Sequence, residues 1–420
     1  MVNKSIPWRW IITRIALALL TVVVALVLGV YYLFSSAARP TPPPPGVKAS
    51  LPFGAIDINE LDLGADSQLQ ASIQKTLLNP AGWYAAQKDG DSRIDILALS
   101  GGGSRGAFGA GVLCGWSAAD TRPDFKIVTG VSTGALQSTF AFLGSEYDSA
   151  LKEIYTQFET VDLYTKRSRV APLYSDATND SIGLSKVIEH YITAEVLEAV
   201  AKKHQHGYRL FVGTTNLDTT EFIIWNMGKI AASERPDALH HYRKVLLASA
   251  SIPVFFPPVY FEVQANGQTY HEMHVDGSTY SNLVFRSFML DIEDAMEKVG
   301  ISLSDFDFRL YIIRNGRRDE ESAREPVPGK ALAIAESTIR TLFKVSSTSA
   351  MYRAYVLANR SNIDYHLAVI PTDYQFDFAV TDFDREGMLE LFEFGYNETA
   401  PNGYQWLKHP PFIDLAEQFE

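Results

Sequence analysis

The sequence of 420 residues contains one cysteine, Cys114. A single thiol excludes a framework of intrachain disulfides and any metal site built from several cysteines. Because Cys114 falls in an apolar stretch, we expect its side chain to be buried and to carry no chemistry. Basic residues are also in deficit, with 37 lysines and arginines against 49 acidic residues and a net charge of −12. This balance argues against nucleic acid as a partner.

The sequence also lacks the His-Glu-x-x-His spacing with which a helix binds zinc. His271 and His274 stand three positions apart in a segment that reads as a strand. Such positions face opposite sides of a sheet, so the two rings would not meet. We therefore expect neither a metal site nor a cofactor.

Hydrophobic residues make up 46% of the chain and charged residues 20%, which is typical of a globular protein with a large core. We expect residues 93–420 to form one domain and residues 51–92 to pack on it as an extension, with a helix over Asp66–Leu78. The pattern predicts helices over Ser149–Phe158, Leu184–Ala201, Tyr242–Ala250 and Asp384–Gly395, and one or two helices over Ala331–Asn359. It predicts strands over Tyr208–Thr215, Glu221–Trp225, Gln268–Val275, Phe308–Ile313 and Tyr365–Ile370. This alternation predicts an α/β fold.

The longest uncharged run covers residues 15–34, and its twenty residues are enough to cross a bilayer. Three basic residues precede the run closely, and two follow it: Lys4, Arg9 and Arg14, then Arg39 and Lys48. The positive-inside rule therefore predicts that residues 1–14 are cytoplasmic. The rest of the chain would lie outside the cytoplasm, in the periplasm if the cell is Gram-negative.

A cleaved signal peptide is the alternative, because Ser36-Ala37-Ala38 offers small residues to a peptidase. The apolar run is longer than the usual signal-peptide core of about 7–15 residues. This length favours an uncleaved transmembrane anchor. The proline-rich residues 35–50 then predict a stiff linker, which could hold the domain up to about 50 Å from the membrane.

The most informative segment begins with a short apolar run, Ile94 to Ser100, which reads as a buried parallel strand. A tight turn, Gly101-Gly102-Gly103-Ser104-Arg105-Gly106, follows it, and Ala107 to Leu113 opens a helix. Such a turn directs several backbone N–H groups into one space, and the helix N-terminus adds the positive end of its dipole. An oxygen that becomes an anion during a reaction would be stabilised there.

The same turn matches the Gly-x-Gly-x-x-Gly fingerprint of dinucleotide-binding folds. That fingerprint expects an acidic residue about 20 positions later, at the end of the second strand. Here the second strand, Phe125 to Thr129, ends in Gly130-Val131-Ser132-Thr133-Gly134, while Asp120 and Asp124 precede it. The sequence therefore disfavours a nucleotide site.

Gly130-x-Ser132-x-Gly134 stands between a strand and an apolar helix over residues 135–143, which is the pattern of a nucleophile elbow. A serine on so sharp a turn needs small neighbours, and its Oγ then stands at the C-terminal edge of the sheet. Two ordinary glycine-rich turns in a doubly wound sheet are the alternative. The position of the motif, one βα unit after a glycine-rich turn, favours the elbow.

With Asp276-Gly277-Ser278 after a strand and the Ala248–Pro253 block, these motifs resemble the patatin-like phospholipase family. The resemblance spans about residues 93–290 and implies a three-layer α/β sandwich with a mostly parallel central sheet. Family members usually carry Asp-Gly-Gly or Asp-Gly-Ala followed by Asn-Pro. Here Asp276 is followed by Gly-Ser-Thr-Tyr-Ser-Asn-Leu, so the shape of this loop is expected to differ.

The resemblance implies a catalytic dyad of Ser132 and Asp276 that works without histidine. It also implies that the backbone N–H groups of Gly102, Gly103 and Ser104 bind the oxyanion. The remaining motif positions would support the two turns: Gly101, Arg105, Gly106, Gly130, Gly134 and Gly277.

Together with the apolar run, the resemblance implies a membrane-anchored lipid acyl hydrolase of the phospholipase A or lysophospholipase type, with membrane lipid as substrate. A general esterase or acyltransferase with a Ser-Asp-His triad is an alternative, for which His366 and His409 are the candidates after the aspartate. A lipid-binding module that has lost catalysis is another. The intact Ser132 and Asp276 argue against that last alternative.

Overall fold

The computed structural model describes residues 8–35, 39–57, 93–168, 171, 175–285, 306–318, 326–375, 378–401 and 403–411. The helix expected over residues 66–78 lies outside them. The described strands are β1 (Ile56–Asp57), β2 (Arg93–Leu99), β3 (Ile127–Val131), β4 (Arg209–Asn216), β5 (Glu221–Asn226), β6 (Val259–Ala265), β7 (Gln268–Asp276), β8 (Asp307–Arg317) and β9 (Asp364–Ile370). The described α-helices are α1 (Trp8–Ser35), α4 (Gly106–Ala118), α5 (Thr133–Leu143), α6 (Asp148–Thr156), α7 (Thr160–Leu163), α8 (Ile182–Tyr191), α9 (Ala194–Gln205), α10 (Met227–Ala231), α11 (Ala238–Ser249), α13 (Ala331–Arg360) and α14 (Arg385–Thr399).

The described strands form one sheet in the order β1-β5-β4-β3-β2-β8-β9, with β7 on β4 and β6 on β7. The five strands β4, β3, β2, β8 and β9 are parallel to one another. Strands β5 and β7 both pair with β4 in the antiparallel sense. The mostly parallel central sheet predicted from the sequence is therefore confirmed.

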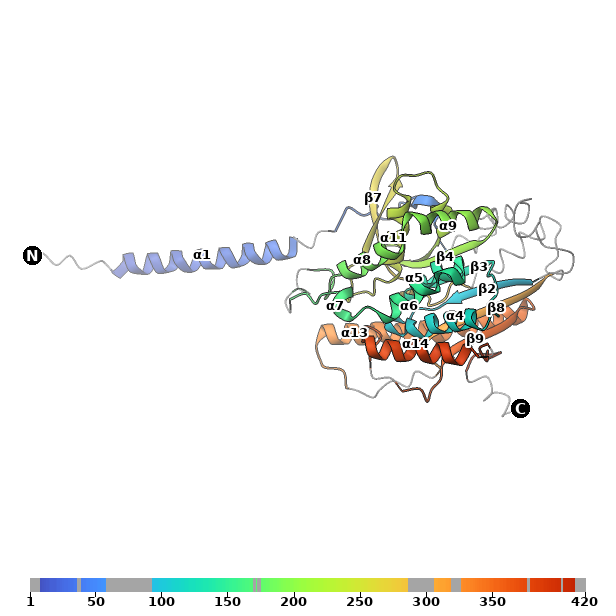
Figure 1. Cartoon of the computed structure of the whole chain (residues 1–420). Helices are drawn as coiled ribbons and strands as arrows, with labels where there is room; N and C mark the ends of the chain where they lie inside the picture. The colour runs from blue at the N-terminus through green and yellow to red at the C-terminus, as the bar shows by residue number, and fades with distance from the viewer. Residues whose placement is uncertain are drawn as a thin grey trace, which may run out of the picture.

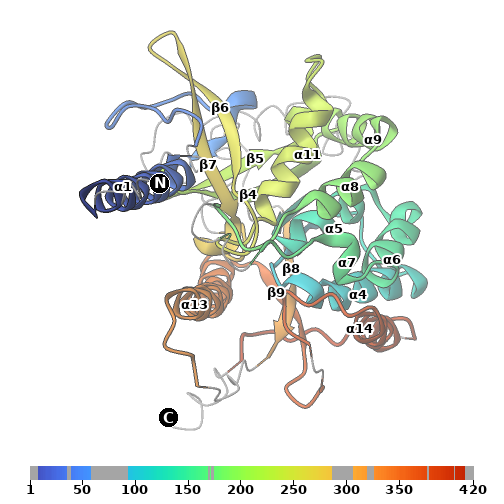
Figure 2. The same cartoon turned by 90° about the vertical axis from the view of Figure 1, so that its left-hand side faces the viewer.

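Strand β2 explains why helices cover both faces of this sheet. Its side chains alternate between two cores: Ile96 and Ala98 pack on the α13 side, while Leu97 and Leu99 pack with α4, α5 and α14. Figure 1 shows the arrangement of the elements, and the turned view in Figure 2 shows α13 on one side of the sheet and α4, α5 and α14 on the other. A parallel strand that is buried on both faces reads as a continuous apolar run, which is the pattern that predicted it.

Several element boundaries differ from the expectation. The single helix expected over residues 184–201 is wrong, because α8 ends at Tyr191 and α9 begins at Ala194. Thr193 separates them, and its side chain caps α9 by accepting a hydrogen bond from the N–H of Val196. The second strand lies at residues 127–131 rather than 125–129, so it runs directly into Ser132. Strand β6 and helix α10 were not predicted.

Helix α1 is one continuous apolar helix. It contains a 25-residue segment, Trp8–Tyr32, with a mean hydropathy of 2.7, which is long and apolar enough to cross a membrane or to act as a signal sequence. The linker that follows does not project freely, in contrast to the expected spacer. The N–H of His271 donates to the carbonyl oxygen of Thr41 at 2.9 Å, and Ser50 forms a β-bridge with Gln264. The linker therefore lies along the β6–β7 hairpin.

Candidate active site

The backbone at Ser132 turns sharply between β3 and α5. Ser132 has φ 55° and ψ −127°, a left-handed conformation that few non-glycine residues adopt, and α5 begins at the next residue. Glycines at both flanks make this turn possible. A Cβ at Gly130 would collide with the carbonyl oxygen of Gly134, and a Cβ at Gly134 would collide with that of Leu99. The predicted elbow motif therefore forms a strand–turn–helix.

The turn directs the Ser132 side chain at Asp276, the last residue of β7. Ser132 Oγ donates a hydrogen bond to Asp276 Oδ2 at 2.6 Å. Strand β7 brings the carboxyl group there by pairing with β4, with Asp276 opposite Thr214. Only 5% of Ser132 and none of Asp276 is exposed. Burial raises the pKa of Asp276 to about 6, although hydrogen bonds from Ser132 and Ser278 oppose the rise.

Other groups hold both members of this pair. The N–H of Ser278 donates to Asp276 Oδ1 at 2.8 Å, and the N–H of Asp276 donates to the carbonyl oxygen of Ser251 at 2.8 Å. The N–H of Ser132 donates to Ser249 Oγ at 2.9 Å, and this hydroxyl donates to the carbonyl oxygen of Gly213 at 2.7 Å. Sequence reasoning identified the block that contains Ser249 but gave this residue no role.

The glycine-rich turn lies beside Ser132. Gly103 and Ser132 line the same pocket, and a Cβ on Gly101 would touch the Ser132 side chain. The N–H groups of Gly102 and Gly103 find no hydrogen-bond acceptor within the described part of the chain. The N–H of Ser104, in contrast, donates to the carbonyl oxygen of Val380 at 3.0 Å. Two of the three N–H groups predicted to bind an oxyanion are thus unengaged.

A network of buried amides supports this turn from behind. Asn282 Oδ1 accepts a hydrogen bond from the N–H of Gly101 at 2.5 Å. Asn315 Nδ2 donates to the carbonyl oxygen of Ser100 at 2.8 Å and to Gln137 Oε1 at 3.1 Å. Gln137 Nε2 donates in turn to the carbonyl oxygen of Gly106. None of these three amides was predicted, because Asn282 follows a polar stretch and Asn315 stands between arginines in the sequence, so neither stands out as a buried polar residue.

The remaining motif residues lie in the glycine-rich turn, at the start of α4 and directly after β7. Arg105 closes the 3₁₀ turn Gly103–Arg105, where its N–H donates to the carbonyl oxygen of Gly102 at 3.2 Å. Gly106 packs against Thr133 and Tyr155 at the start of α4. Gly277 packs against Gly213 directly after Asp276.

The pocket in front of Ser132 is apolar. Its walls come mainly from α5, α7, α8 and α11 and from the segment before α14: Leu136, Phe140, Leu163, Leu184, Leu246 and Phe383. An apolar cavity that ends at a serine hydroxyl fits a hydrocarbon chain whose reactive group reaches the serine. Phe256 also lines this pocket.

Histidine is not part of this arrangement. All nine histidines of the chain lie in the described residues, and none of them hydrogen-bonds to Ser132 or Asp276. His366 stacks on Tyr311 with ring centroids 4.5 Å apart and contacts Lys408, while His409 contacts the carbonyl oxygen of Pro410. No group of three His, Cys, Asp or Glu side chains that could hold a metal ion occurs in the described ranges.

Comparison with known protein families agrees with the motifs. Residues 97–289 match the model of the patatin-like phospholipase family. VipD from Legionella pneumophila is a similar solved structure, at 11% identity and a TM-score of 0.36. That alignment covers 73% of this chain and 66% of VipD. No curated protein matches the sequence. The chain therefore carries a patatin-like phospholipase domain, and this domain contains Ser132, Asp276 and the glycine-rich turn.

Proposed function

We propose that this protein is a lipid acyl hydrolase that uses Ser132 as nucleophile and Asp276 as its only general base. The observation that carries the proposal is the buried hydrogen bond of 2.6 Å between Ser132 Oγ and Asp276 Oδ2. A carboxylate with an ordinary pKa near 4 is a weak base at neutral pH. Burial of Asp276 raises its pKa to about 6, which makes it a stronger base that is still ionised at pH 7.

The proposed reaction has two halves. Ser132 Oγ forms a bond to the ester carbonyl carbon while its proton passes to Asp276. The carbonyl oxygen becomes an oxyanion, and the unengaged N–H groups of Gly102 and Gly103 donate to it. The proton then passes from Asp276 to the leaving alkoxide as the ester C–O bond breaks, which leaves an acyl-enzyme. Water attacks this intermediate by the same route and releases the fatty acid.

Ser104 is a third donor in this proposal under one condition. Its N–H is engaged by the carbonyl oxygen of Val380, so Val380 has to move before Ser104 can bind an oxyanion. Gly102 and Gly103 do not need that movement. We therefore assign the main stabilisation to these two glycines.

The substrate class follows from the apolar pocket. Aliphatic and aromatic side chains from several helices surround the approach to Ser132, and such a cavity favours a long acyl chain over a short one. We infer that the substrates are long-chain phospholipids or lysophospholipids.

We also propose that α1 anchors the protein in a membrane, with residues 1–14 in the cytoplasm and the domain outside it. The length of the apolar helix and the basic residues before it support this topology. The full-length protein should stay in the membrane fraction after an alkaline carbonate wash. Recovery of a mature N-terminus near Arg39 from cells would overturn the anchor.

A fluorophosphonate probe tests the chemistry, because it reacts covalently with an activated serine. Wild-type protein should be labelled and Ser132→Ala should not, and a lipid panel should give the highest turnover on long-chain substrates. Turnover confined to acetyl or butyryl esters would indicate a general esterase instead. A well-folded protein with no labelling and no turnover would indicate a binding module.

A further inference from the structure

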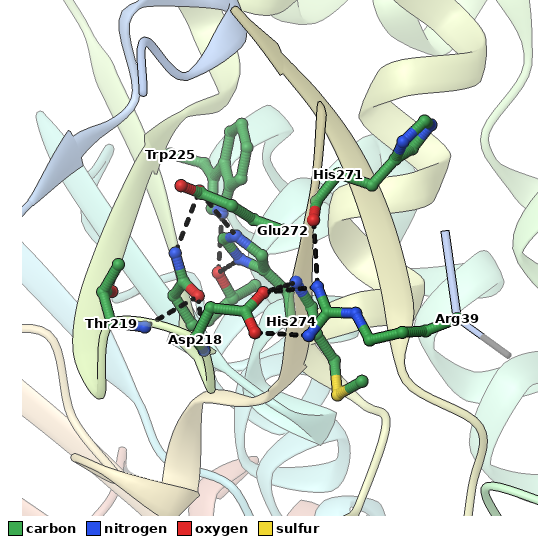
Figure 3. Close-up of polar contacts among 10 residues, drawn as sticks. Arg39, Asp218, Thr219, Trp225, His271, Glu272 and His274 are labelled. Atoms are coloured by element: carbon green, nitrogen blue, oxygen red, sulfur yellow. Dashed lines mark hydrogen bonds and ion pairs between the residues drawn. The ribbon is translucent and has the colours of Figure 1, made fainter. Parts of the chain in front are cut away.

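The segment that follows α1 is bound to the domain from Arg39 onward, only four residues after the end of the helix. The Arg39 guanidinium forms a two-pronged ion pair with Asp218, in which Nη1 contacts Oδ1 and Nη2 donates to Oδ2 at 2.7 Å. Arg39 Nη2 also donates to the carbonyl oxygen of His271 at 3.0 Å. Figure 3 shows Arg39 reaching from the linker to Asp218 and to the backbone of β7.

This contact is partly shielded from water and has further support. Side-chain exposure is 27% for Arg39 and 22% for Asp218. Burial alone would raise the pKa of Asp218, but hydrogen bonds from Arg39 and from the N–H of Met273 hold it below its ordinary value. The carbonyl oxygen of Thr41 accepts a hydrogen bond from His271 two residues further along the linker. Several bonds therefore act together at the first residues of the linker.

The fixed linker limits how far the domain can stand from the end of α1. Four peptide units join Ser35, the last residue of α1, to Arg39. Even fully extended, they reach only about 15 Å. The proline content alone suggests a long spacer between α1 and the domain. Because Arg39 and Thr41 contact the domain, the distance between the end of α1 and the domain is short instead.

The side of the domain that faces α1 is the active-site side. Asp218 follows β4, Ser132 follows β3, and α13 begins after β8, so all three lie at the C-terminal edge of the parallel strands. Figure 1 shows α1, α7, α8 and α13 on the same side of the domain. Figure 2, which turns this side toward the viewer, shows that α1 lies beside β6 and β7 and away from α7 and α8.

Apolar side chains are exposed on that face. Val161 of α7 is 78% exposed, Ile182 at the start of α8 is 60% exposed, and Ile334 in the first turn of α13 is 52% exposed. Leu217, beside Asp218, is 40% exposed. Helices α7 and α8 also line the pocket through Leu163 and Leu184. Val161 and Ile182 therefore lie within two residues of side chains that line the pocket in front of Ser132.

We propose that this face, defined by Val161, Ile182, Leu217 and Ile334, rests on the same lipid bilayer that α1 spans. The short fixed linker holds the face there, and its apolar side chains enter the boundary between head groups and acyl chains. The pocket then opens toward lipid, so that an acyl chain reaches Ser132 without crossing water. This inference rests on the proposed membrane anchor and deepens the proposed function.

Depth measurements on the full-length protein in phosphatidylcholine–phosphatidylglycerol nanodiscs test the proposal. A spin label is attached at Val161→Cys or Ile182→Cys, and the native Cys114 is buried. The matched control is Ala118→Cys, at the exposed end of α4 that lies away from the C-terminal edge. The first two labels should collide with oxygen more often than with a water-soluble nickel complex, and the control label should show the reverse. Equal exposure of all three labels to the nickel complex would overturn the proposal.

Turnover provides an independent measurement. The double variant Val161→Ser/Ile182→Ser should lose about tenfold or more of its activity on phospholipid vesicles and stay within twofold of wild type on a water-soluble ester. Val356→Ser, which alters a valine 61% exposed near the other end of α13, should match wild type on both substrates. Equal activity of both variants on vesicles would contradict the proposal. A wild-type protein that hydrolyses neither substrate would refute the proposed function, while the label depths would still decide whether the face meets the bilayer.

Discussion

Ser132 Oγ lies 2.6 Å from Asp276 Oδ2, although the two residues are 144 positions apart in the chain. The contact joins the left-handed elbow after β3 to the end of an antiparallel strand, β7. In the mechanism we propose, neither element alone would make the serine reactive. The elbow exposes the hydroxyl to the pocket, and the pairing of β7 with β4 supplies a buried carboxylate at the same point.

The first prediction concerns this pair. Ser132→Ala and Asp276→Asn should each lower kcat by about 10³-fold or more, because each removes one half of a single proton transfer. The double variant should be scarcely worse than either single one. Steady-state kinetics on a lysophospholipid measures all three. Additive losses in the double variant would mean that the residues act independently.

Two histidine variants provide the control for this prediction. His366→Ala and His409→Ala should retain substantial turnover, since neither ring contacts Ser132 or Asp276. A folded histidine variant as inactive as Asp276→Asn would establish a triad and refute the dyad.

The second prediction concerns pH. Burial raises the pKa of Asp276 to about 6, and the carboxyl group acts as a base only when it is ionised. kcat/KM should therefore rise with pH through an inflection near 6 and level off above pH 7. As pH falls below the inflection, activity should decrease about tenfold per pH unit.

The temperature dependence of this inflection distinguishes a carboxylate base from a histidine base with a similar pKa. Ionisation of a carboxylic acid has an enthalpy near zero, whereas ionisation of an imidazolium absorbs heat. The inflection should therefore stay nearly constant between 15 and 35 °C. A clear fall of the inflection with rising temperature would indicate an imidazole base.

The parallel core and the elbow could be predicted from the sequence because their signals are local. Strand β2 is a continuous apolar run, and the spacing of Gly130, Ser132 and Gly134 encodes the turn within five residues. The β6–β7 hairpin also had a local signal that was overlooked. Asn266 and Gly267 both have positive φ, as a two-residue hairpin turn requires, and alternating apolar residues precede them.

Other features had no local signal. The linker reads as a spacer from its prolines, and only the distant Asp218 and His271 make Arg39 a point of attachment. The hydrogen bond from Ser104 to Val380 joins a backbone N–H to a backbone carbonyl oxygen. Because every residue has such a carbonyl group, no residue type in the sequence marks this contact. Such contacts depend on how the fold brings distant segments together. They therefore cannot be predicted from the residues of either segment alone.

The third prediction concerns Ser249, whose hydroxyl links the N–H of Ser132 to the carbonyl oxygen of Gly213. Ser249→Ala leaves two buried backbone groups without this partner, and such groups cost about 1–3 kcal/mol each. The elbow should loosen, and kcat should fall about tenfold with little change in KM. Ser249→Thr, which keeps the hydroxyl, should recover part of the loss.

The matched control is Ser251→Ala. Ser251 is also buried, but its hydroxyl donates to the carbonyl oxygen of Leu247 within its own segment. Kinetics of both variants, with thermal unfolding to compare their stability, separates positioning from general destabilisation. If both variants lose kcat equally, Ser249 has no special role at the elbow.

The last prediction concerns Gly103, where the backbone has φ 57° and a Cβ would collide with the carbonyl oxygen of Val380. In Gly103→Ala, this carbonyl or the turn itself has to shift, and the N–H groups of the turn shift with it. Loss of one oxyanion donor typically costs about 10²–10³-fold in kcat, so we expect a loss of about 10²-fold or more.

Positive φ alone also strains an alanine, so the control must separate strain from crowding. Gly267 has φ 74° and nothing within 4 Å of the position of its missing Cβ, at the tip of the β6–β7 hairpin. Gly267→Ala should therefore cost some stability, on the order of 1 kcal/mol, and leave kcat unchanged. A Gly103→Ala protein that unfolds at the same temperature as Gly267→Ala but keeps wild-type kcat would mean that this turn serves packing and stabilises no oxyanion.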